Sequence, residues 1–290
     1  MPTLHPYKGD TLFYQRIFGK LKIVSTLEGF VKMTNPTINF QTAPGHQILA
    51  AAGKKYLRPG GRAATEQLFQ WADFQTGERV LELASSFGYS AIALAQRYGV
   101  KVVGVEKNPE SVARARANIR AAGLENQVEI VEGDIFHLEA IPGEFDYVVA
   151  EAILSMQSPP GKAKILAGIR TRLKPGGKFL SHELLAREQA EQIHSELARV
   201  IRSNSTPVSE ASWIKACETA GLQVQKHQTG AMALLNFKLA LQDEGIANTV
   251  KILWNVLTRP AIRKRILEMR GVFQKYRHQL GYIILYAVAE

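Results

Sequence analysis

Residues 79–91 form the stretch that most restricts the possible folds of this chain. The sequence RVLELASSFGYSA begins with an apolar run that ends in an acid, continues with small residues and a glycine, and becomes helix-like at about Ser90. This order predicts a strand, a tight turn and a helix. A turn of this kind presents backbone N–H groups at a helix N-terminus to the polar part of a cofactor.

Strand-like and helix-like segments alternate after this stretch. The expected strands are residues 80–83, 102–106, 128–132, 146–150 and 178–181, with one inside 224–235 and a terminal one at 282–288. The expected helices are 90–98, 110–122, 162–173, 188–202, 208–220, 246–257 and 260–280. Strands separated by helices of this length form right-handed crossovers, so a parallel sheet is expected.

Composition places the chain among globular proteins with a basic surface. In 290 residues, 36 Lys and Arg outnumber 26 Asp and Glu, which gives a formal net charge of +10. The single cysteine, Cys217, excludes an internal disulfide and fits a reducing compartment. Residues 1–30 show no secretory signal, and no apolar run reaches the roughly 18 residues of a membrane span. We therefore expect a cytoplasmic protein without a transmembrane segment.

Four later landmarks accompany the first turn. Glu106 closes the second expected strand and Asp134 follows the third; residues 145–149 read FDYVV, and residues 174–177 read KPGG before the fifth strand. In this order and spacing the chain resembles the class I S-adenosylmethionine-dependent methyltransferases. The resemblance covers roughly residues 76–185 and the last strand.

The first turn departs from that family's pattern. The family has an acidic-x-Gly-x-Gly-x-Gly sequence there, whereas this chain has Glu82 followed by Ala84, Ser86 and Gly88 at the three glycine positions. Alanine and serine are the next smallest residues, so a ligand can still approach the backbone. Only glycine reaches positive φ without cost, which leaves the geometry of the turn open at this point.

The resemblance implies S-adenosylmethionine as the cofactor and assigns its contacts. Glu106 is expected to accept hydrogen bonds from the ribose hydroxyls, and Asp134 to contact the adenine amino group. The loop at residues 57–61 is expected either to hold the methionine carboxylate or to be a surface turn. The expected cofactor residues are Arg58, Gly60, Glu82, Ala84, Ser85, Ser86, Gly88, Glu106, Lys107, Gly133, Asp134, Ile135 and Glu151.

The resemblance also implies a fold and a domain plan. The fold is an α/β, Rossmann-like seven-stranded sheet, mostly parallel with an antiparallel last strand, with helices on both faces and a helical cap. We expect an N-terminal helical cap at 1–75 and a methyltransferase core at 76–235. A helical lid insertion at 236–281 precedes the last core strand, 282–290. Apolar lid residues such as Trp254 could enclose an apolar substrate.

Catalytic residues are not fixed by this fold, because the sulfonium is already an activated leaving group and the enzyme mainly aligns the acceptor. His182 and Glu151 follow the fifth and fourth strands and are the expected catalytic residues; no metal site is expected. A histidine titrates near neutrality and can act as a base. A hydrogen-bonded structural histidine is the alternative, and Glu151 could instead contact the methionine end of the cofactor.

The acceptor class stays open among several readings. A small-molecule methyltransferase is the leading hypothesis, with an apolar or anionic substrate. The basic residues within 251–278 also fit an RNA methyltransferase, peripheral contact with a membrane, or a solvated helix face, and a homo-oligomer is a further option. Because glycines are missing from the first turn, a non-catalytic protein that binds S-adenosylmethionine is another hypothesis. A nicotinamide-dependent enzyme is disfavoured because Gly-x-Gly-x-x-Gly is absent.

Overall fold

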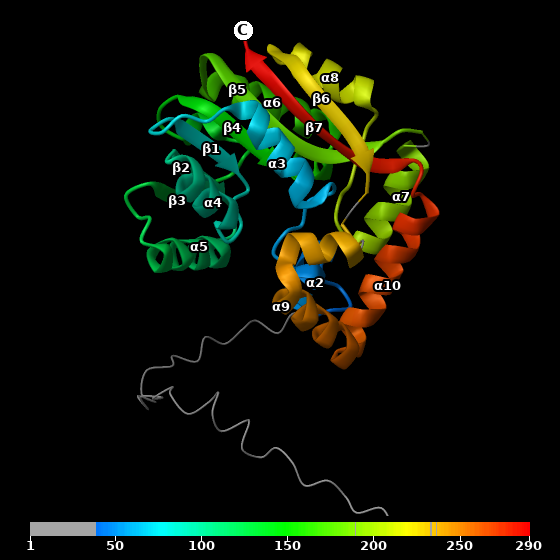
Figure 1. Ribbon diagram of the computed structural model, residues 1–290. Helices are drawn as coiled ribbons and strands as arrows, with labels where there is room; N and C mark the ends of the chain where they lie inside the picture. Colours follow the sequence, from blue (N-terminus) through cyan, green and yellow to red (C-terminus); the bar gives the residue numbers. More distant parts are fainter. Residues whose placement is uncertain (1–38, 189, 233, 236) are drawn as a thin grey trace, which may run out of the picture. The chain divides into compact units, whose positions relative to one another are not determined.

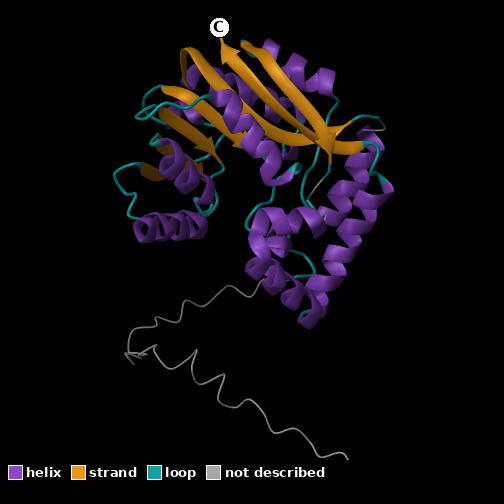
Figure 2. Cartoon of the chain, viewed as in Figure 1, coloured by secondary structure: helices purple, strands orange, loops and turns teal. Residues whose placement is uncertain are grey.

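A seven-stranded sheet forms the centre of the computed structural model, with strand order β3-β2-β1-β4-β5-β7-β6 (Figure 1). The structure describes residues 39–188, 190–232, 234–235 and 237–290. About half of the expected N-terminal cap, residues 1–38, therefore lies outside the described residues. Helices cover the sheet and continue past one end of it (Figure 2).

The sheet has the expected mixed direction. The strands are β1 (Arg79–Leu83), β2 (Lys101–Glu106), β3 (Val128–Glu132), β4 (Phe145–Glu151), β5 (Leu173–Ala186), β6 (Leu222–Ala231) and β7 (Leu280–Ala289). The first five are parallel, whereas β7 runs antiparallel between β5 and β6. The prediction of a mostly parallel sheet with an antiparallel last strand is confirmed.

Helices follow the strands as the alternation requires. They are α2 (Gly45–Ala52), α3 (Gly61–Ala72), α4 (Tyr89–Tyr98), α5 (Pro109–Ala122), α6 (Pro159–Arg172), α7 (Ala190–Ile201), α8 (Glu210–Thr219), α9 (Phe237–Thr258) and α10 (Pro260–Lys275), with short 3₁₀ turns η1 (Leu138–Ala140) and η2 (Leu154–Met156). Side-chain N-caps define where two of these helices begin. Asn108 accepts the Ser111 N–H before α5, and Ser158 accepts the Gly161 N–H before α6.

Successive residues of each strand point to opposite faces and build two cores. On β1, Val80 joins α3, α4 and α5 on one face, while Leu81 joins α6 and α8 on the other. A third core, at the carboxyl end of β5, packs α2, α7 and α10 around Ile48, Leu197 and Ile262. We call α2, α7 and α10 the helical layer. The loop that leads from α2 to α3 reaches Glu151 at the end of β4 through Arg58 and His182 of β5 through Gly60.

Several element boundaries differ from the sequence prediction. β5 starts at Leu173 instead of 178, because Leu173 already pairs with Phe145 before the 174–177 turn interrupts the register. α9 starts at Phe237 instead of 246 and contains a break at Gly245 (φ 74°, ψ 166°), so two helical segments meet there. No described helix is both long enough and apolar enough to cross a membrane.

Candidate functional site

The turn after β1 adopts the backbone that glycines would adopt most easily. Ala84, Ser86 and Gly88 all have positive φ, at 54°, 50° and 76°. These are the three positions at which the family has glycine. A left-handed conformation costs a residue with a Cβ about 1–2 kcal/mol, so the surrounding structure must impose it. The turn therefore has the left-handed geometry although only Gly88 of the three glycines is present.

Neighbouring strands hold this turn in place. The Ser85 hydroxyl donates to the Glu82 carboxylate (2.5 Å), and the Ser85 N–H donates to the Val105 carbonyl (3.0 Å). A Cβ on Gly104 of β2 would overlap the Ser85 hydroxyl, so glycine is required there for the turn to approach β2. The Phe87 ring packs 4.2 Å from the Arg114 guanidinium of α5, which places this bulky side chain against α5.

Glu106, at the end of β2, is joined to the turn. One carboxylate oxygen accepts the Ser86 N–H (2.8 Å) and the other accepts the Asn108 N–H (2.9 Å). Each carboxylate oxygen has more than one lone pair, so both can still accept a hydroxyl donor. Both carboxylate oxygens of Glu106 therefore keep acceptor capacity beside the turn.

Asp134 lies beyond β3 and completes this end of the site. Its carboxylate binds the Lys107 ammonium (2.8 Å) and accepts the Phe136 N–H (3.0 Å). The Lys107 hydrogen bond, followed by that from Phe136, lowers the pKa of Asp134. The neighbouring Gly133 N–H donates to the Glu106 carbonyl, which ties Asp134 and the half-buried Ile135 to the end of β2. The structure thus brings the expected adenine and ribose residues together.

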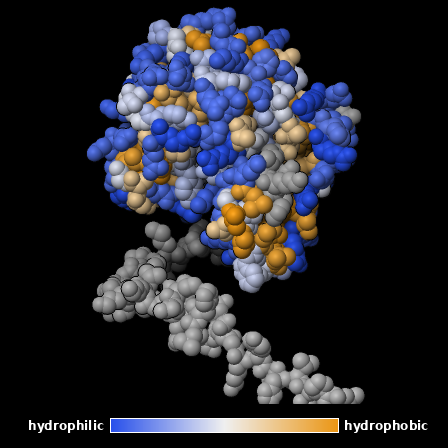
Figure 3. Space-filling view, viewed as in Figure 1, coloured by the Kyte–Doolittle hydropathy of each residue, from blue (hydrophilic) through white to orange (hydrophobic). Residues whose placement is uncertain are grey.

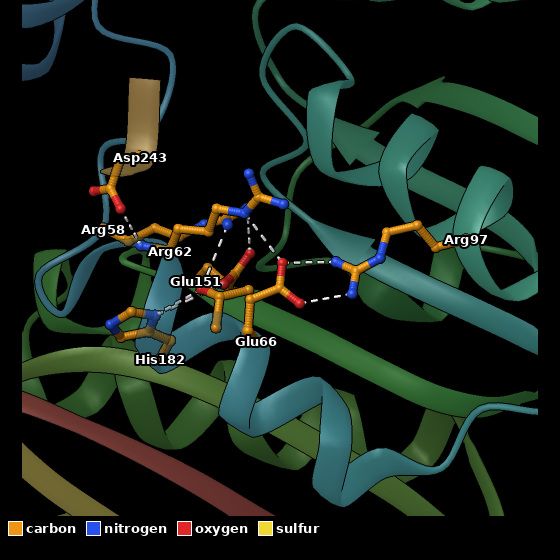
Figure 4. A network of polar contacts seen from close by, with 8 residues as sticks. Arg58, Arg62, Glu66, Arg97, Glu151, His182 and Asp243 are labelled. Atoms are coloured by element: carbon orange, nitrogen blue, oxygen red, sulfur yellow. Dashed lines mark hydrogen bonds and ion pairs between the residues drawn. The ribbon is translucent and has the colours of Figure 1, made fainter. Parts of the chain in front are cut away.

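A buried ion pair marks the other end of the site (Figure 4). Arg58 comes from the loop before α3 and lies 2.7 Å from the Glu151 carboxylate at the end of β4. The same guanidinium contacts the Ser90 hydroxyl of α4 (2.5 Å). Thr65 of α3 donates to the other Glu151 oxygen (2.7 Å). Arg58 is therefore an internal group near the carboxyl ends of β1 and β4, which disfavours the surface-turn reading.

His182 is wholly buried beside this pair, in register with Glu151 on the neighbouring strand. Its Nε2 accepts the Gly60 N–H (2.9 Å), so the neutral ring carries its proton on Nδ1, 3.0 Å from the Thr65 hydroxyl. Burial lowers the pKa of His182, and the charge of Arg58 lowers it further against the opposing effect of Glu151. Both ring nitrogens are occupied, which favours the structural reading of His182 over the expected catalytic base.

Glu151 and Glu82 differ in their charge states although both are buried. Burial opposes ionisation of Glu151, but Arg58, His182 and Thr65 outweigh it and lower the pKa of that carboxyl. Burial raises the pKa of Glu82 to about 7, and the Glu151 charge adds to the rise against the opposing effects of Ser85 and Arg58. Glu82 can thus change protonation near neutral pH, next to the turn.

Glu183 has a structural role that the sequence did not indicate. This buried carboxylate accepts the N–H groups of Ile153, Leu154 and Ser155 at 3.2, 2.9 and 2.8 Å. The loop after β4 can turn back toward Glu183 because Ala152 has a positive φ of 55°. The loop on the expected acceptor side is therefore fixed from β5, and the Ser155 hydroxyl is bound to Glu183 (2.6 Å) instead of being free for a substrate.

Two acids of α9 hold the loop that carries Arg58. Asp243 accepts the Arg62 N–H at the start of α3 (2.8 Å), and Glu244 accepts the N–H groups of Lys55 and Tyr56 (2.9 and 3.1 Å). Figure 4 shows Asp243 reaching down to this helix start. Sequence reasoning missed both, because their partners lie on distant segments and the acids form no local motif.

Metal binding and thiol chemistry find no support in the described part of the chain. Within residues 39–188, 190–232, 234–235 and 237–290, no group of three or more His, Cys, Asp or Glu side chains could hold a metal ion. Cys217 is buried in α8, and burial raises its pKa to about 12. Cys217 is therefore a buried helical thiol and no candidate nucleophile.

The chain is similar in sequence to known proteins. Residues 80–177 match the family described as methyltransferase domain. An uncharacterised protein of Haemophilus influenzae is 32% identical over 240 residues, covering 82% of this chain and 95% of that protein. Methyltransferase GfsG of Streptomyces halstedii is 26% identical over 209 residues, covering 67% of this chain and 74% of GfsG.

Solved structures share the fold at low sequence identity. The [4+2]-cyclase SpnF has a TM-score of 0.64 and 20% identity, with 86% of this chain and 97% of SpnF covered. A methyltransferase of Thiobacillus denitrificans, solved with S-adenosylhomocysteine, has a TM-score of 0.62 and 17% identity, with 84% of this chain and 98% of that protein covered. At these identities the likeness establishes the fold.

Proposed function

Because the chain belongs to the class I S-adenosylmethionine-dependent methyltransferases, we propose that it transfers the methyl group of this cofactor to a small-molecule acceptor. The observation that carries the proposal is the turn at Ala84 and Ser86. Two non-glycine residues are held in left-handed conformations there, and Glu106 binds the turn from β2. Strained backbone of this kind is typical of functional sites, and a turn with only a structural role would not require it.

Different residues around the turn are proposed to contact different parts of the cofactor. We assign Glu106 to the ribose hydroxyls, and Asp134, Lys107 and Ile135 to the adenine. Arg58 and Ser90 stand at the methionine end, where a guanidinium can bind a carboxylate in two-pronged fashion. Glu151 supplies negative charge for a cationic ligand, and Glu82 adds to it when it loses its proton near pH 7. When bound, the cofactor supplies a methyl group on a sulfonium, and the protein aligns the acceptor with it.

His182 is proposed to position this site instead of removing a proton. It connects the Gly60 N–H to Thr65, and Thr65 in turn connects it to Glu151. His46 of α2, an exposed imidazole on the helix before the Arg58 loop, is the base that we propose in its place. Desolvation lowers the pKa of His46 against the opposing effect of the Glu106 charge. A neutral imidazole there can accept a proton from an acceptor.

The helical layer supports a small and at least partly apolar acceptor. Half-buried apolar side chains of three separate segments, Leu57, Met156 of η2 and Leu234, pack against the core formed by α2, α7 and α10. We keep the division into cap, core, lid and last strand as a proposal on the same basis. The expected role of Trp254 in enclosing a substrate needs correction, because this side chain is 67% exposed on the outer side of α9.

Calorimetry with S-adenosylmethionine tests the proposal directly. The wild-type protein should bind the cofactor, and Glu106→Ala should weaken binding by about 1.5–3 kcal/mol through loss of charge-assisted hydrogen bonds. Glu129→Ala, an exposed acid on the adjacent strand β3, is the matched control and should bind as the wild type does. If the folded protein shows no binding at millimolar cofactor, the proposal that it is a methyltransferase is contradicted.

A second measurement separates catalysis from binding alone. Incubation with cofactor labelled in its methyl group and with pools of small apolar compounds should give a labelled product and S-adenosylhomocysteine. Cofactor binding without transfer to any pool would favour the non-catalytic alternative.

A further inference from the structure

The outer face of α9 beyond Gly245 is apolar where a surface helix is normally polar. Ile246, Val250, Leu253, Trp254 and Leu257 are 75%, 60%, 40%, 67% and 64% exposed. Their spacing places all five on one stripe about 100° wide. We call these five residues the apolar stripe; Figure 3 shows a hydrophobic area over this helix.

The opposite side of α9 already packs against the protein. The buried Asn255 side chain donates to the Ala52 carbonyl of α2 (3.0 Å), and Ile252 and Val256 pack against the core around α2 and α10. The helix is therefore attached through one face and presents a second apolar face outward. Folding does not need the apolar stripe, and a contiguous exposed patch of large apolar side chains indicates a binding surface.

Exposed basic side chains border the apolar stripe. Lys251 lies beside it on α9, and Arg259, Arg263, Lys264 and Arg270 follow on α10 and the turn before it. Residues 246–278 contain one acid, Glu268, which is paired with Arg265. Apolar area with a tryptophan, edged by Lys and Arg, is the composition of helices that lie in the headgroup region of anionic bilayers.

We propose that α9 and α10 dock on an anionic lipid membrane, with the apolar stripe inserted at the interface and the basic side chains at the headgroups. The proposal goes beyond methyl transfer and does not rest on it. The docking element is also the one whose Asp243 and Glu244, just before the Gly245 break, hold the loop of Arg58. Membrane contact would thus occur at the element that holds the loop of Arg58.

Other occupants fit the charge pattern less well. A second copy of the chain, related by a two-fold axis, would bring the same basic borders against each other. An RNA strand would be held by the basic border and would leave the central apolar stripe exposed to water. An anionic bilayer can take up the apolar stripe at its interface and bind the basic side chains through its headgroups.

Vesicle binding tests the proposal without any cofactor or acceptor. Vesicles of phosphatidylcholine with about 30% phosphatidylglycerol should bind the full chain at least about tenfold more tightly than pure phosphatidylcholine, and salt should weaken the binding. Trp254 is far more exposed than the buried Trp213, so a blue shift of tryptophan emission with anionic vesicles should report insertion. Equal affinity for both vesicle types, or no binding, would overturn the proposal.

Matched variants separate the two parts of the surface. The double variant Trp254→Ser/Leu257→Ser and the triple variant Lys251→Gln/Lys264→Gln/Arg270→Gln should each lose at least about tenfold in vesicle affinity. Lys101→Gln/Arg120→Gln/Lys215→Gln removes the same charge from exposed positions on β2, α5 and α8 and should retain wild-type binding. Equal loss in this control would show that only net charge acts.

The competing occupants give distinct results. Sedimentation velocity that reveals a dimer abolished by Trp254→Ser/Leu257→Ser would assign the apolar stripe to self-association and overturn the membrane proposal. Retention on RNA that depends on Lys251, Lys264 and Arg270, together with absence of vesicle binding, would assign the surface to nucleic acid. Circular dichroism melting of each variant should match the wild type, because all eight altered side chains are exposed.

Discussion

The Arg58 guanidinium and the Glu151 carboxylate lie 2.7 Å apart, with side chains only 12% and 9% exposed. This ion pair joins the loop before α3 to the end of β4. It also explains why two glutamates near the same edge behave differently: Glu151 has a cation in direct contact, whereas Glu82 has the Ser85 hydroxyl.

Breaking the Arg58–Glu151 pair on one side should be costly. Arg58→Gln or Glu151→Gln leaves the partner charge buried and should lower the free energy of unfolding by about 3–5 kcal/mol. The double variant should lose much less than the sum. Urea unfolding of the double-mutant cycle measures this, and Arg62→Gln, in an exposed pair with Glu66, should cost less than about 1 kcal/mol. Additive losses would contradict a direct pair.

Ala84→Gly should be nearly neutral for stability, unlike most alanine-to-glycine changes. Glycine relieves the left-handed strain but gains entropy in the unfolded chain, and each effect is about 1 kcal/mol. Ala117→Gly, at an exposed position in the middle of α5, should lose about 1 kcal/mol because it has no strain to relieve. Thermal unfolding compares the two. An equal loss at both positions would mean that Ala84 is not strained.

Glu82 should make the protein less stable as the pH rises toward neutrality. Its pKa is about 7 in the folded chain against an ordinary value of 4.5, so the folded state keeps a proton that the unfolded state releases between these values. The contribution is therefore fully present below about pH 4.5 and is lost as the pH rises through 7, on the order of 3 kcal/mol in total.

The difference between wild type and Glu82→Gln isolates this contribution. Denaturant unfolding across pH 4.5–8 should show a wild-type stability that falls relative to the variant as the pH rises. Glu125→Gln, at an exposed position, should run parallel to the wild type throughout. Parallel curves for Glu82→Gln would place the titration elsewhere.

His182 should stay neutral at pH 7 with its proton on Nδ1. The Gly60 N–H occupies Nε2, and burial lowers the pKa of His182. Long-range nitrogen correlations in NMR distinguish the two tautomers and the imidazolium, and His182→Ala identifies the signals. A proton on Nε2, or a charged ring at pH 7, would contradict the positioning role and restore His182 as a base.

The sequence alone determined the sheet, the order of its elements and the polar residues at the ends of its strands. Strand–turn–helix signals are local, and parallel strands bring their carboxyl ends to one edge, so Glu82, Glu106 and Asp134 could be placed together. The buried face of α10 was also predictable, because Ile262, Met269 and Phe273 recur at helical spacing and are buried.

Tertiary structure alone decided the partners of His182, the roles of Asp243 and Glu244, and the outward direction of the apolar stripe. Each depends on how segments far apart in the sequence dock. Hydrogen-bond partners such as Gly60 and His182 share no local pattern. In α9 both faces are apolar, so helical periodicity cannot tell which face meets the protein. That choice is made by packing against α2 and by the Asn255 hydrogen bond, which leaves Trp254 on the outside.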